Sequence, residues 1–508
     1  MNTDKGRLLK ALGRNTASNG VFFAVGRGVE LVTFAALVRI LPLEDYGLLL
    51  LASALIGQFA ILDGGLSLAV QKFIPQFKAE RRSDDIGRVI TATLVFFAGI
   101  GLIACVILLG ALALDLTRFF GAHNTDNATR IFVAAALLAL FEWPIRVLEN
   151  CCKGFNLFHE LNVVVFIQHI AASLITVGSA LAGVGIVWIF VLRWVPRVGG
   201  AMGMWLLIQK AHSGPLIVFD RRLPNVFRTM FHYSKWILIN QISGTLVNQF
   251  DRVIVAIALG VNKVPIYYGL NRIFKSVLQV NGIMKSAVVP IASEMHAAHS
   301  RETFDELAQR GTRTFNALFA PSVALIVIFV GPILLLMGGE DFVPYAGCLQ
   351  AALVLLLFSA SRGFINSMLL GAGSVIRNQS LLGVLTSMIF LAAMYLGLRF
   401  LGVCGGVLAH PATHLLLMPL WMCTVLVKSG TSIRGFMRAV LQGQLSALLG
   451  IAVFAIISRV SWNSRIEVAL SVLLSIAMVI LTWSYSLDVR IRYRICCYVR
   501  GGFARLGG

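Results

Sequence analysis

Residues 39–65 read RILPLEDYGLLLLASALIGQFAILDGG, and similar long apolar stretches recur along the rest of the chain. The apolar run begins near Leu48, after two adjacent acids, Glu44 and Asp45, and it contains a lone aspartate, Asp63, close to its end. Runs of about 20 apolar residues are long enough to cross the ~30 Å hydrocarbon core of a bilayer as helices. The stretch therefore predicts a membrane-spanning helix that carries a carboxylate near its C-terminal end.

The composition of the whole chain agrees with a membrane protein. The 508 residues are 58% hydrophobic and 13% charged, and the mean hydropathy is +0.83. Soluble globular proteins carry about 25% charged residues, so a soluble fold is excluded. We expect an all-α integral membrane protein of about fourteen spans, which cover residues 18–41, 46–71, 89–114, 131–150, 161–182, 186–209, 236–258, 265–291, 314–337, 346–370, 378–398, 403–427, 439–458 and 466–487.

The basic residues orient this stack of helices. With the N-terminus inside, the cytoplasmic segments carry 27 Lys and Arg residues and the outside segments carry 6, as the positive-inside rule requires. The net charge of +20 is then explained by the membrane, and we expect no nucleic-acid partner. No small-residue cleavage site follows the first apolar run, so we expect it to be retained as a helix. The predicted location is the bacterial inner membrane, with both termini cytoplasmic.

An internal repeat divides the chain. Residues 39–49, RILPLEDYGLL, resemble residues 257–270, IALGVNKVPIYYGL, and both cross an outside turn into the next span. The repeat predicts two pseudo-symmetric six-helix lobes plus two C-terminal helices, an arrangement typical of transporters with a path between lobes. The expected division is an N-terminal lobe at 1–209, a cytoplasmic linker at 210–235, a C-terminal lobe at 236–427, and two extra helices with a basic tail at 428–508.

Several charges fall inside predicted spans, where each costs about 2.5–3.5 kcal/mol on insertion scales unless it pairs, snorkels or lines water. Arg27 and Glu30 share one face of span one, so they form an ion pair or line a cavity. Arg193 and Arg197 flank Pro196 in span six. Spans seven, eight and ten carry further polar residues, namely Gln241, Thr245, Asn248, Asp251 and Arg252, then Asn271, Arg272, Lys275, Gln279 and Lys285, and finally Arg362.

These buried charges are mainly cationic. The three acids within the spans, Glu30, Asp63 and Asp251, cannot neutralise this larger set of cations in a dry interior. We therefore expect a hydrated cationic cavity that binds an anion. Arginine suits phosphate because its planar fork gives paired hydrogen bonds. The predicted substrate-binding residues are Arg27, Arg193, Arg197, Arg252, Arg272, Lys275 and Arg362, and the predicted counter-ion or coupling residues are Glu30, Asp63 and Asp251.

Other charged and reactive residues receive simpler interpretations. Arg39, Arg146 and Glu149 lie near helix ends, where snorkelling explains them, and Glu142 and Arg146 are spaced to pair. The eight cysteines show no metal-ligand spacing and are expected to be ordinary thiols. His410 and His414 lack a third ligand, so we expect no metal. No Walker A sequence and no catalytic constellation is present, so we expect neither a cofactor nor an enzyme.

Four segments carry a resemblance to a known family. They are RILPLEDYGLLLLASALIGQFAILDGGLSLAVQKFIPQF, NQFDRVIVAIALGVNKVPIYYGLNRIF with the downstream VVPIASEMH, PILLLMGGEDFVPYAGCLQ, and LRFLGVCGGVLAHPATHLLLMPLW. Because these segments occur in this order and at this spacing, the chain resembles bacterial polysaccharide-biosynthesis flippases of the multidrug/oligosaccharidyl-lipid/polysaccharide exporter superfamily. The resemblance implies two lobes around a cationic cavity, with cavity charges at positions matching Arg27, Arg252 and Arg272. Span six is more basic than this family pattern.

The resemblance also implies a substrate and a mechanism. We expect a polyprenyl-pyrophosphate-linked oligosaccharide, such as an O-antigen or exopolysaccharide repeat unit, to move from the cytoplasmic to the outer leaflet by alternating access. The partners would be membrane lipids and the polymerase and glycosyltransferases of the same pathway. Coupling to H⁺ or to Na⁺ stays open. The alternatives are an ion-coupled multidrug extruder of the same superfamily and a membrane polymerase or ligase of lipid-linked glycans.

Overall fold

The computed structural model describes residues 25–63, 65–113, 125–212, 214–232, 244, 246–247, 250–286, 301–372, 376–427 and 431–457, with five isolated positions after residue 472. Within these residues the chain forms helices and turns and no strand, which confirms the all-α fold class. The chain divides into two compact units, Met1–Gly269 and Leu270–Gly508. The predicted division into two lobes, a linker and a C-terminal extension stays a prediction.

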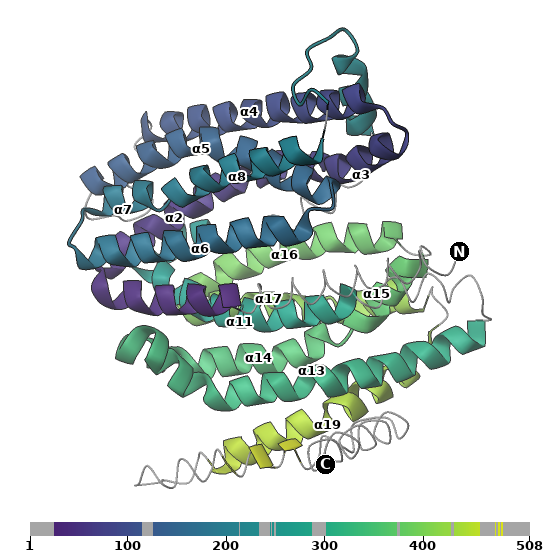
Figure 1. Ribbon diagram of the computed structural model, residues 1–508. Helices are drawn as coiled ribbons and strands as arrows, with labels where there is room; N and C mark the ends of the chain where they lie inside the picture. Colours follow the sequence, from purple (N-terminus) through teal and green to yellow (C-terminus); the bar gives the residue numbers. More distant parts are fainter. Residues whose placement is uncertain are drawn as a thin grey trace, which may run out of the picture. The chain divides into compact units, whose positions relative to one another are not determined.

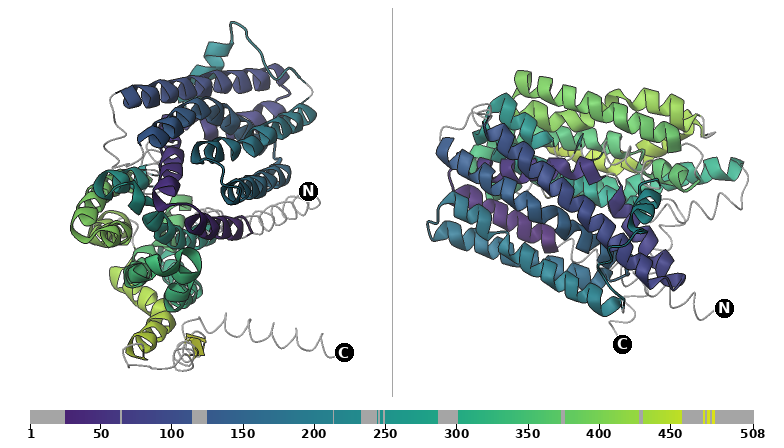
Figure 2. Two further views of the ribbon diagram at one scale, coloured as in Figure 1. Left: turned by 90° about the vertical axis from the view of Figure 1, so that its left-hand side faces the viewer. Right: turned by 90° about the horizontal axis from the view of Figure 1, so that it is seen from above.

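The N-terminal unit is a bundle of long helices (Figure 1 and Figure 2). Residues 25–40 are helical, and the following elements are α2 (Leu43–Gln58), the short 3₁₀ helix η1 (Phe59–Asp63), α3 (Leu66–Ala79), α4 (Ser83–Ala113), α5 (Thr125–Gly154), α6 (Phe158–Leu181), α7 (Ile186–Leu192), α8 (Val195–Ala211), α10 (Asp251–Leu259) and η3 (Val261–Lys263). Helix α5 lies at the centre, because it packs against α2, α3, α4, α7 and α8.

The C-terminal unit begins within α11 (Val264–Ser286) and is also helical. Its other elements are α13 (Arg301–Gly338), η4 (Gly339–Tyr345), α14 (Ala346–Ala360), α15 (Gly363–Ala372), α16 (Ile376–Leu401), α17 (Val403–Leu416), α18 (Met418–Trp421), the π-helix η5 (Met422–Leu426) and α19 (Ile433–Ile457). Helix α13 lies beside α14 and α19, and α17 lies beside α14 and α16 (Figure 1).

Within the described ranges, nine helices are long and apolar enough to cross a membrane. The chain is therefore a multi-pass membrane protein, whereas the count of fourteen spans stays a prediction, because span seven lies partly and span fourteen mostly outside the described residues. Three predicted spans are interrupted. Span two breaks at Gly65, which has a φ of +79°, span six breaks at Arg193 and Trp194, and span ten breaks at Ser361 and Arg362.

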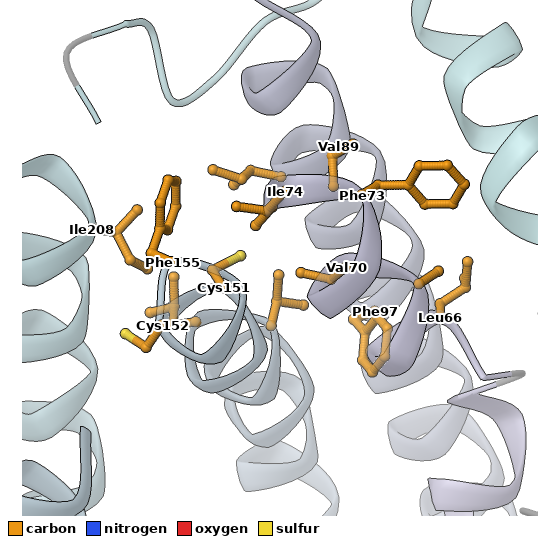
Figure 3. Close-up of a cluster of buried hydrophobic side chains, with 14 of the residues drawn as sticks. Leu66, Val70, Phe73, Ile74, Val89, Phe97, Cys151, Cys152, Phe155 and Ile208 are labelled. Carbon is orange, nitrogen blue, oxygen red and sulfur yellow. The ribbon is translucent and has the colours of Figure 1, made fainter. Parts of the chain in front are cut away.

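Helix α3 shows why these elements pack as they do. Its buried residues Leu66, Val70, Phe73, Ile74 and Phe77 recur at helical spacing and so form one apolar stripe. This stripe meets α4 and α5 in a cluster that also contains the buried thiols of Cys151 and Cys152 (Figure 3). These two cysteines are ordinary buried residues, as expected.

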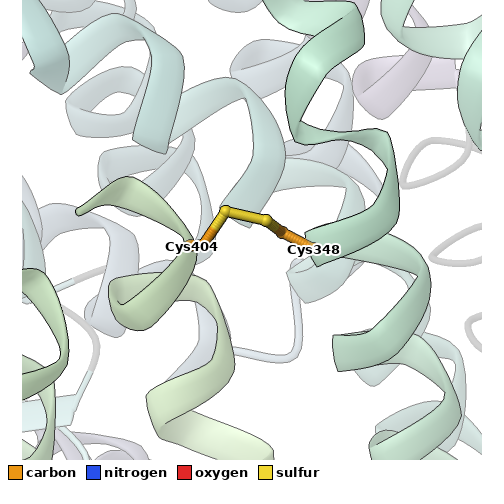
Figure 4. Close-up of a disulfide and its surroundings, with 2 residues drawn as sticks. All are labelled: Cys348 and Cys404. Atoms are coloured by element: carbon orange, nitrogen blue, oxygen red, sulfur yellow. A yellow bond between two sulfur atoms is a disulfide. The ribbon is translucent and has the colours of Figure 1, made fainter. Parts of the chain in front are cut away.

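Two other cysteines correct that expectation. Cys348, in the first turn of α14, and Cys404, at the start of α17, form a disulfide with a Cα–Cα distance of 5.3 Å (Figure 4). The two residues are 56 positions apart in the sequence, so only the packing of α14 against α17 brings them together. Cys496 and Cys497 lie outside the described residues.

A close crossing of α16 and α17 is made possible by glycine. A Cβ atom on Gly405 would lie 1.9 Å from the backbone oxygen of Gly397. Helix pairs in membranes associate through such small residues, because lipid supplies no hydrophobic drive between them. The two glycines therefore set the separation of these helices.

Candidate functional site

Two cavities of the N-terminal unit share the side chains of Arg146, His169 and Arg197. The larger has a volume of about 840 Å³ and lies between η1, α3, α5, α6 and α8. The smaller has a volume of about 350 Å³ and lies between α2, α5, α6, the junction of α7 and α8, and α10. Their charged lining residues are Asp63, Glu142, Arg146, Glu149, Lys153, Arg193, Arg197 and Arg252.

Helix α5 supplies half of these charges. Glu142, Arg146, Glu149 and Lys153 follow one another at spacings of four, three and four residues. Residues three or four apart lie on the same helix face, so one stripe of α5 presents two acids and two cations to the cavities. This polar stripe lines the cavities, whereas the other, apolar faces of α5 pack against neighbouring helices.

Arg197 connects this stripe to α8. Its Nε and Nη2 donate to the two carboxylate oxygens of Glu142 at 2.9 and 3.2 Å, and its Nη1 donates to Glu149 at 2.8 Å. Arg146 Nε donates to the same Glu142 at 2.9 Å. The Glu142 side chain is only 9% exposed, and a carboxylate so buried needs such partners to stay ionised. Arg146 and Arg197 are thus held mainly by acids of the protein.

The break in span six places Arg193 and Arg197. Helix α7 ends at Leu192, and Pro196 lies in the first turn of α8, where its missing N–H removes no helical hydrogen bond. Farther along α8, a Cβ on Gly200 would overlap the Gln168 side chain of α6, and Gln168 Nε2 donates to the Arg197 carbonyl at 3.3 Å. The close approach of α6 and α8 therefore fixes the position of Arg197.

Arg193 and Arg252 give the smaller cavity its charge. Arg193 lies over the Phe190 ring at 5.9 Å, and it forms no ion pair within the described part of the chain. Arg252, from α10, lies over the Tyr268 ring at 5.4 Å, and its Nε is 3.9 Å from Asp251 Oδ1. Glu142 is the sole carboxylate among the described lining residues of this cavity, against four arginines. The cavity is therefore electropositive.

Asp63 occupies the corner between η1 and α3. It is 5% exposed, and its Oδ1 accepts a hydrogen bond from the Ser67 amide at 3.0 Å, which satisfies a free N–H at the start of α3. Asn150 of α5 donates to Ser67 Oγ at 2.8 Å and accepts from Gln71 at 2.9 Å. Asp63 lines the larger cavity, so it faces protein and the cavity interior. Its role as counter-ion or coupling group stays a prediction.

The remaining predicted residues lie elsewhere. Arg27 pairs with Glu30 at 2.7 Å on the helix 25–40. Asp251 is 1% exposed and accepts from the Tyr267 hydroxyl at 3.4 Å. Arg272 and Lys275 lie half-buried on α11 in the C-terminal unit. Arg362 lies in that unit too, where it contacts His414 Nδ1 and stacks over Trp421. Gln241, Thr245 and Asn248 lie outside the described residues, as does the side chain of Lys285.

Sequence reasoning missed part of this site. Arg146 and Glu149 were expected to snorkel, but the structure places both in the wall of the larger cavity. Their spacing of four and seven residues from Glu142 places all three side chains on one helix face, and this pattern is visible in the sequence. His169 gave no such signal, since a lone histidine in an apolar helix is uninformative. Among the described residues, no three His, Cys, Asp or Glu side chains lie close enough together to hold a metal ion.

Comparisons with known proteins place this geometry in context. A candidate O-antigen transporter from Shigella flexneri is 21% identical over 339 residues, which cover 65% of this chain and 77% of that protein. The solved structure of the lipid II flippase MurJ, in an inward closed conformation, has a TM-score of 0.68 at 16% identity over 94% of this chain and 99% of its own.

A multidrug resistance MATE transporter of the MOP superfamily, in an inward-facing conformation, has a TM-score of 0.61 at 15% identity over 86% of this chain and 96% of its own. At these identities the solved structures establish the fold. The family model described as polysaccharide biosynthesis protein matches residues 12–296, more than half of the sequence. The chain therefore belongs to the polysaccharide biosynthesis protein family.

Proposed function

We propose that the protein is a flippase that moves a polyprenyl-pyrophosphate-linked oligosaccharide from the cytoplasmic to the outer leaflet of the bacterial inner membrane by alternating access. Membership of the polysaccharide biosynthesis family and the similarity to a candidate O-antigen transporter support a lipid-linked glycan as the cargo. The similarity to the MurJ fold supports a transporter rather than an enzyme.

The observation that carries this proposal is the charge of the smaller cavity. Arg146 and Arg197 are committed to Glu142 and Glu149, whereas Arg193 has no carboxylate partner within the described residues. Arg252 lines the same cavity, with its Nε 3.9 Å from Asp251 Oδ1 and its Nη1 3.5 Å from the Leu50 carbonyl oxygen. Two guanidinium groups facing one cavity are suited to an anion with several oxygens, because each can donate paired hydrogen bonds. The pyrophosphate of a lipid-linked sugar is such an anion.

The cycle requires a source of free energy and an orientation. We propose coupling to H⁺ or Na⁺, with Asp63, Glu30 and Asp251 as the candidate coupling or counter-ion residues, and with Arg27, Arg272, Lys275 and Arg362 as further substrate contacts. The excess of basic residues in the predicted cytoplasmic segments supports cytoplasmic termini. The polymerase and glycosyltransferases of the same pathway would supply and consume the lipid-linked glycan.

The test uses a deletion strain that depends on this protein for surface polymer. Arg193→Ala and Arg252→Ala should each lower polymer output about 10- to 100-fold, as expected for loss of a hydrogen bond to a charged group, and lipid-linked units should accumulate on the cytoplasmic leaflet. Arg130→Ala is the matched control, because Arg130 is exposed on the second turn of α5 and lines neither cavity.

Three outcomes would count against the proposal. Normal polymer in both cavity variants, at wild-type protein levels, would contradict a cationic substrate site. A robust drug-resistance phenotype on overexpression would favour the multidrug extruder. Accumulation of lipid-linked units on the outer leaflet would favour a polymerase or ligase.

A further inference from the structure

A separate cavity of about 440 Å³ lies between the corner joining α3 to α4 and the segment 214–232. It shares no lining residue with the two cavities of the candidate site. Its described lining residues are Phe73, Gln76, Phe77, Arg82, Asp85, Arg222, Asn225, Val226, Thr229 and Met230. The proposed function makes no use of this cavity.

The segment that forms its outer wall is firmly docked on α4. Arg88 donates to Asp220 through Nε at 2.9 Å and Nη2 at 2.6 Å, and to Asp85 through Nη1 at 2.5 Å. The Val218 amide donates to Thr91 Oγ1 at 2.8 Å. Gly87 permits this approach, since a Cβ there would lie 2.3 Å from the Pro215 carbonyl oxygen. These contacts hold segment 214–232 in place on α4, so the wall that this segment gives the cavity is a fixed part of the N-terminal unit.

The lining combines an apolar floor with a polar rim. Phe73, Phe77, Val226 and Met230 belong to the core cluster of this unit or pack against it. The rim carries the amides of Gln76 and Asn225, the hydroxyl of Thr229, two arginines and the Asp85 carboxylate. The Asp85 carboxylate is paired with Arg82 and Arg88.

The two arginines of the rim differ in their partners. Arg82 stacks on Phe77 at 4.6 Å and pairs with Glu80 at 2.8 Å and Asp85 at 2.6 Å. The Arg222 guanidinium forms no ion pair within the described residues. One uncompensated cation therefore stands beside apolar surface.

The residues around this cavity are of the kinds expected at the level of the lipid headgroups. Helix α4 is a candidate membrane span, and its charged residues lie in its first two turns, before an apolar run that starts at Val89. On segment 214–232 the apolar side chains of Ile217, Phe219 and Phe231 are 51%, 72% and 47% exposed. Exposed aromatic and aliphatic side chains next to arginines are typical of segments that lie in the membrane interface.

We propose that this cavity binds the anionic headgroup of a phospholipid from the leaflet that contacts this end of the bundle. Arg222 would contact the phosphate, and the Asn225 amide would donate to its ester or glycerol oxygens. The Thr229 hydroxyl already donates to the Asn225 carbonyl at 2.9 Å. The acyl chains would leave over the exposed apolar side chains. A soluble phosphate would gain nothing from the apolar floor. This proposal stands independently of the transported substrate.

The experiment measures lipid retained by the purified full-length protein in native mass spectrometry, with phosphatidylglycerol or phosphatidylcholine added. Because Arg222→Ala removes direct hydrogen bonds to a charged group, it should weaken phosphatidylglycerol binding about tenfold or more. Arg228→Ala is the matched control, because Arg228 is exposed on the same segment but does not line the cavity. Arg222→Lys should restore part of the binding.

The expected pattern is a loss specific to Arg222 and to phosphatidylglycerol, with phosphatidylcholine retention unchanged. Equal losses in the Arg222 and Arg228 variants would indicate diffuse electrostatic attraction and overturn the site. Displacement of phosphatidylglycerol by millimolar inorganic pyrophosphate would indicate a soluble phosphate site and overturn the lipid assignment. Since Arg222 is exposed and makes no ion pair within the described residues, its substitution should leave the elution volume in size exclusion unchanged.

Discussion

Replacement of Glu142 by glutamine tests the network at the centre of the candidate site. Glu142→Gln preserves the volume of the side chain but removes the charge that holds Arg146 and Arg197. The carboxylate accepts three hydrogen bonds from these two arginines while its side chain is 9% exposed. The arginines would keep their charges and lose their shared counter-ion.

The size of the effect follows from this burial. Breaking a buried ion pair by removing one partner costs about 3–5 kcal/mol, and the glutamine oxygen still accepts one bond, so we expect about 3 kcal/mol. Glu149→Gln is the control. Glu149 accepts one bond from Arg197, and its side chain is 22% exposed, so its loss should cost about 1 kcal/mol, as for pairs near a surface.

The assay is equilibrium unfolding of the purified variants in mixed micelles with increasing dodecyl sulfate, followed by tryptophan fluorescence. A double variant, Glu142→Gln with Arg197→Gln, should be less destabilised than the sum of its two single variants, because the residues contact each other. The reasoning fails if Glu142→Gln costs no more than Glu149→Gln, or if the effects of the double variant simply add.

Two further predictions concern the docked segment and the crossing of α16 and α17. The Arg88 guanidinium lowers the pKa of Asp220 through its hydrogen bonds, so the docking is fully stabilised above an unfolded aspartate pKa of about 3.9 and weakens as pH falls through the lower folded value. Hydrogen exchange should show segment 214–232 protected at pH 7 and released below about pH 4, and Asp220→Asn should release it already at pH 7. Gly405→Ala should destabilise the protein by about 1–3 kcal/mol, because its new methyl group would meet the backbone at Gly397. Gly347→Ala, which has open space around it, should be neutral or slightly stabilising when both are compared by thermal unfolding.

Much of the fold was accessible from sequence because apolar runs in a membrane protein report directly on helices. The run from Leu48 predicted a span, and residues Leu43–Asp63 form a helical stretch long and apolar enough to be one. The break at Ser361 and Arg362 was not predicted, since a single arginine in an apolar run indicates polarity without indicating that the helix stops. Hydrophobicity specifies where helices lie more reliably than where they end.

Only part of the candidate site could be predicted from the sequence, and the reason is different. The stripe of Glu142, Arg146 and Glu149 is local and could have been found from its spacing. The contacts of Arg197 with Glu142 and of Arg88 with Asp220 join residues 55 and 132 positions apart. Such contacts depend on which helices become neighbours, and a single sequence does not encode that in any short pattern.

The disulfide between Cys348 and Cys404 bears on the sidedness of the protein in its membrane. Two thiols join only by giving up two electrons and two protons to an oxidant, and bacterial cells maintain that chemistry outside the cytoplasmic membrane. Both cysteines lie at helix ends that the distribution of basic residues assigns to the outside. Redox chemistry and charge are independent criteria, and both support the same proposed orientation.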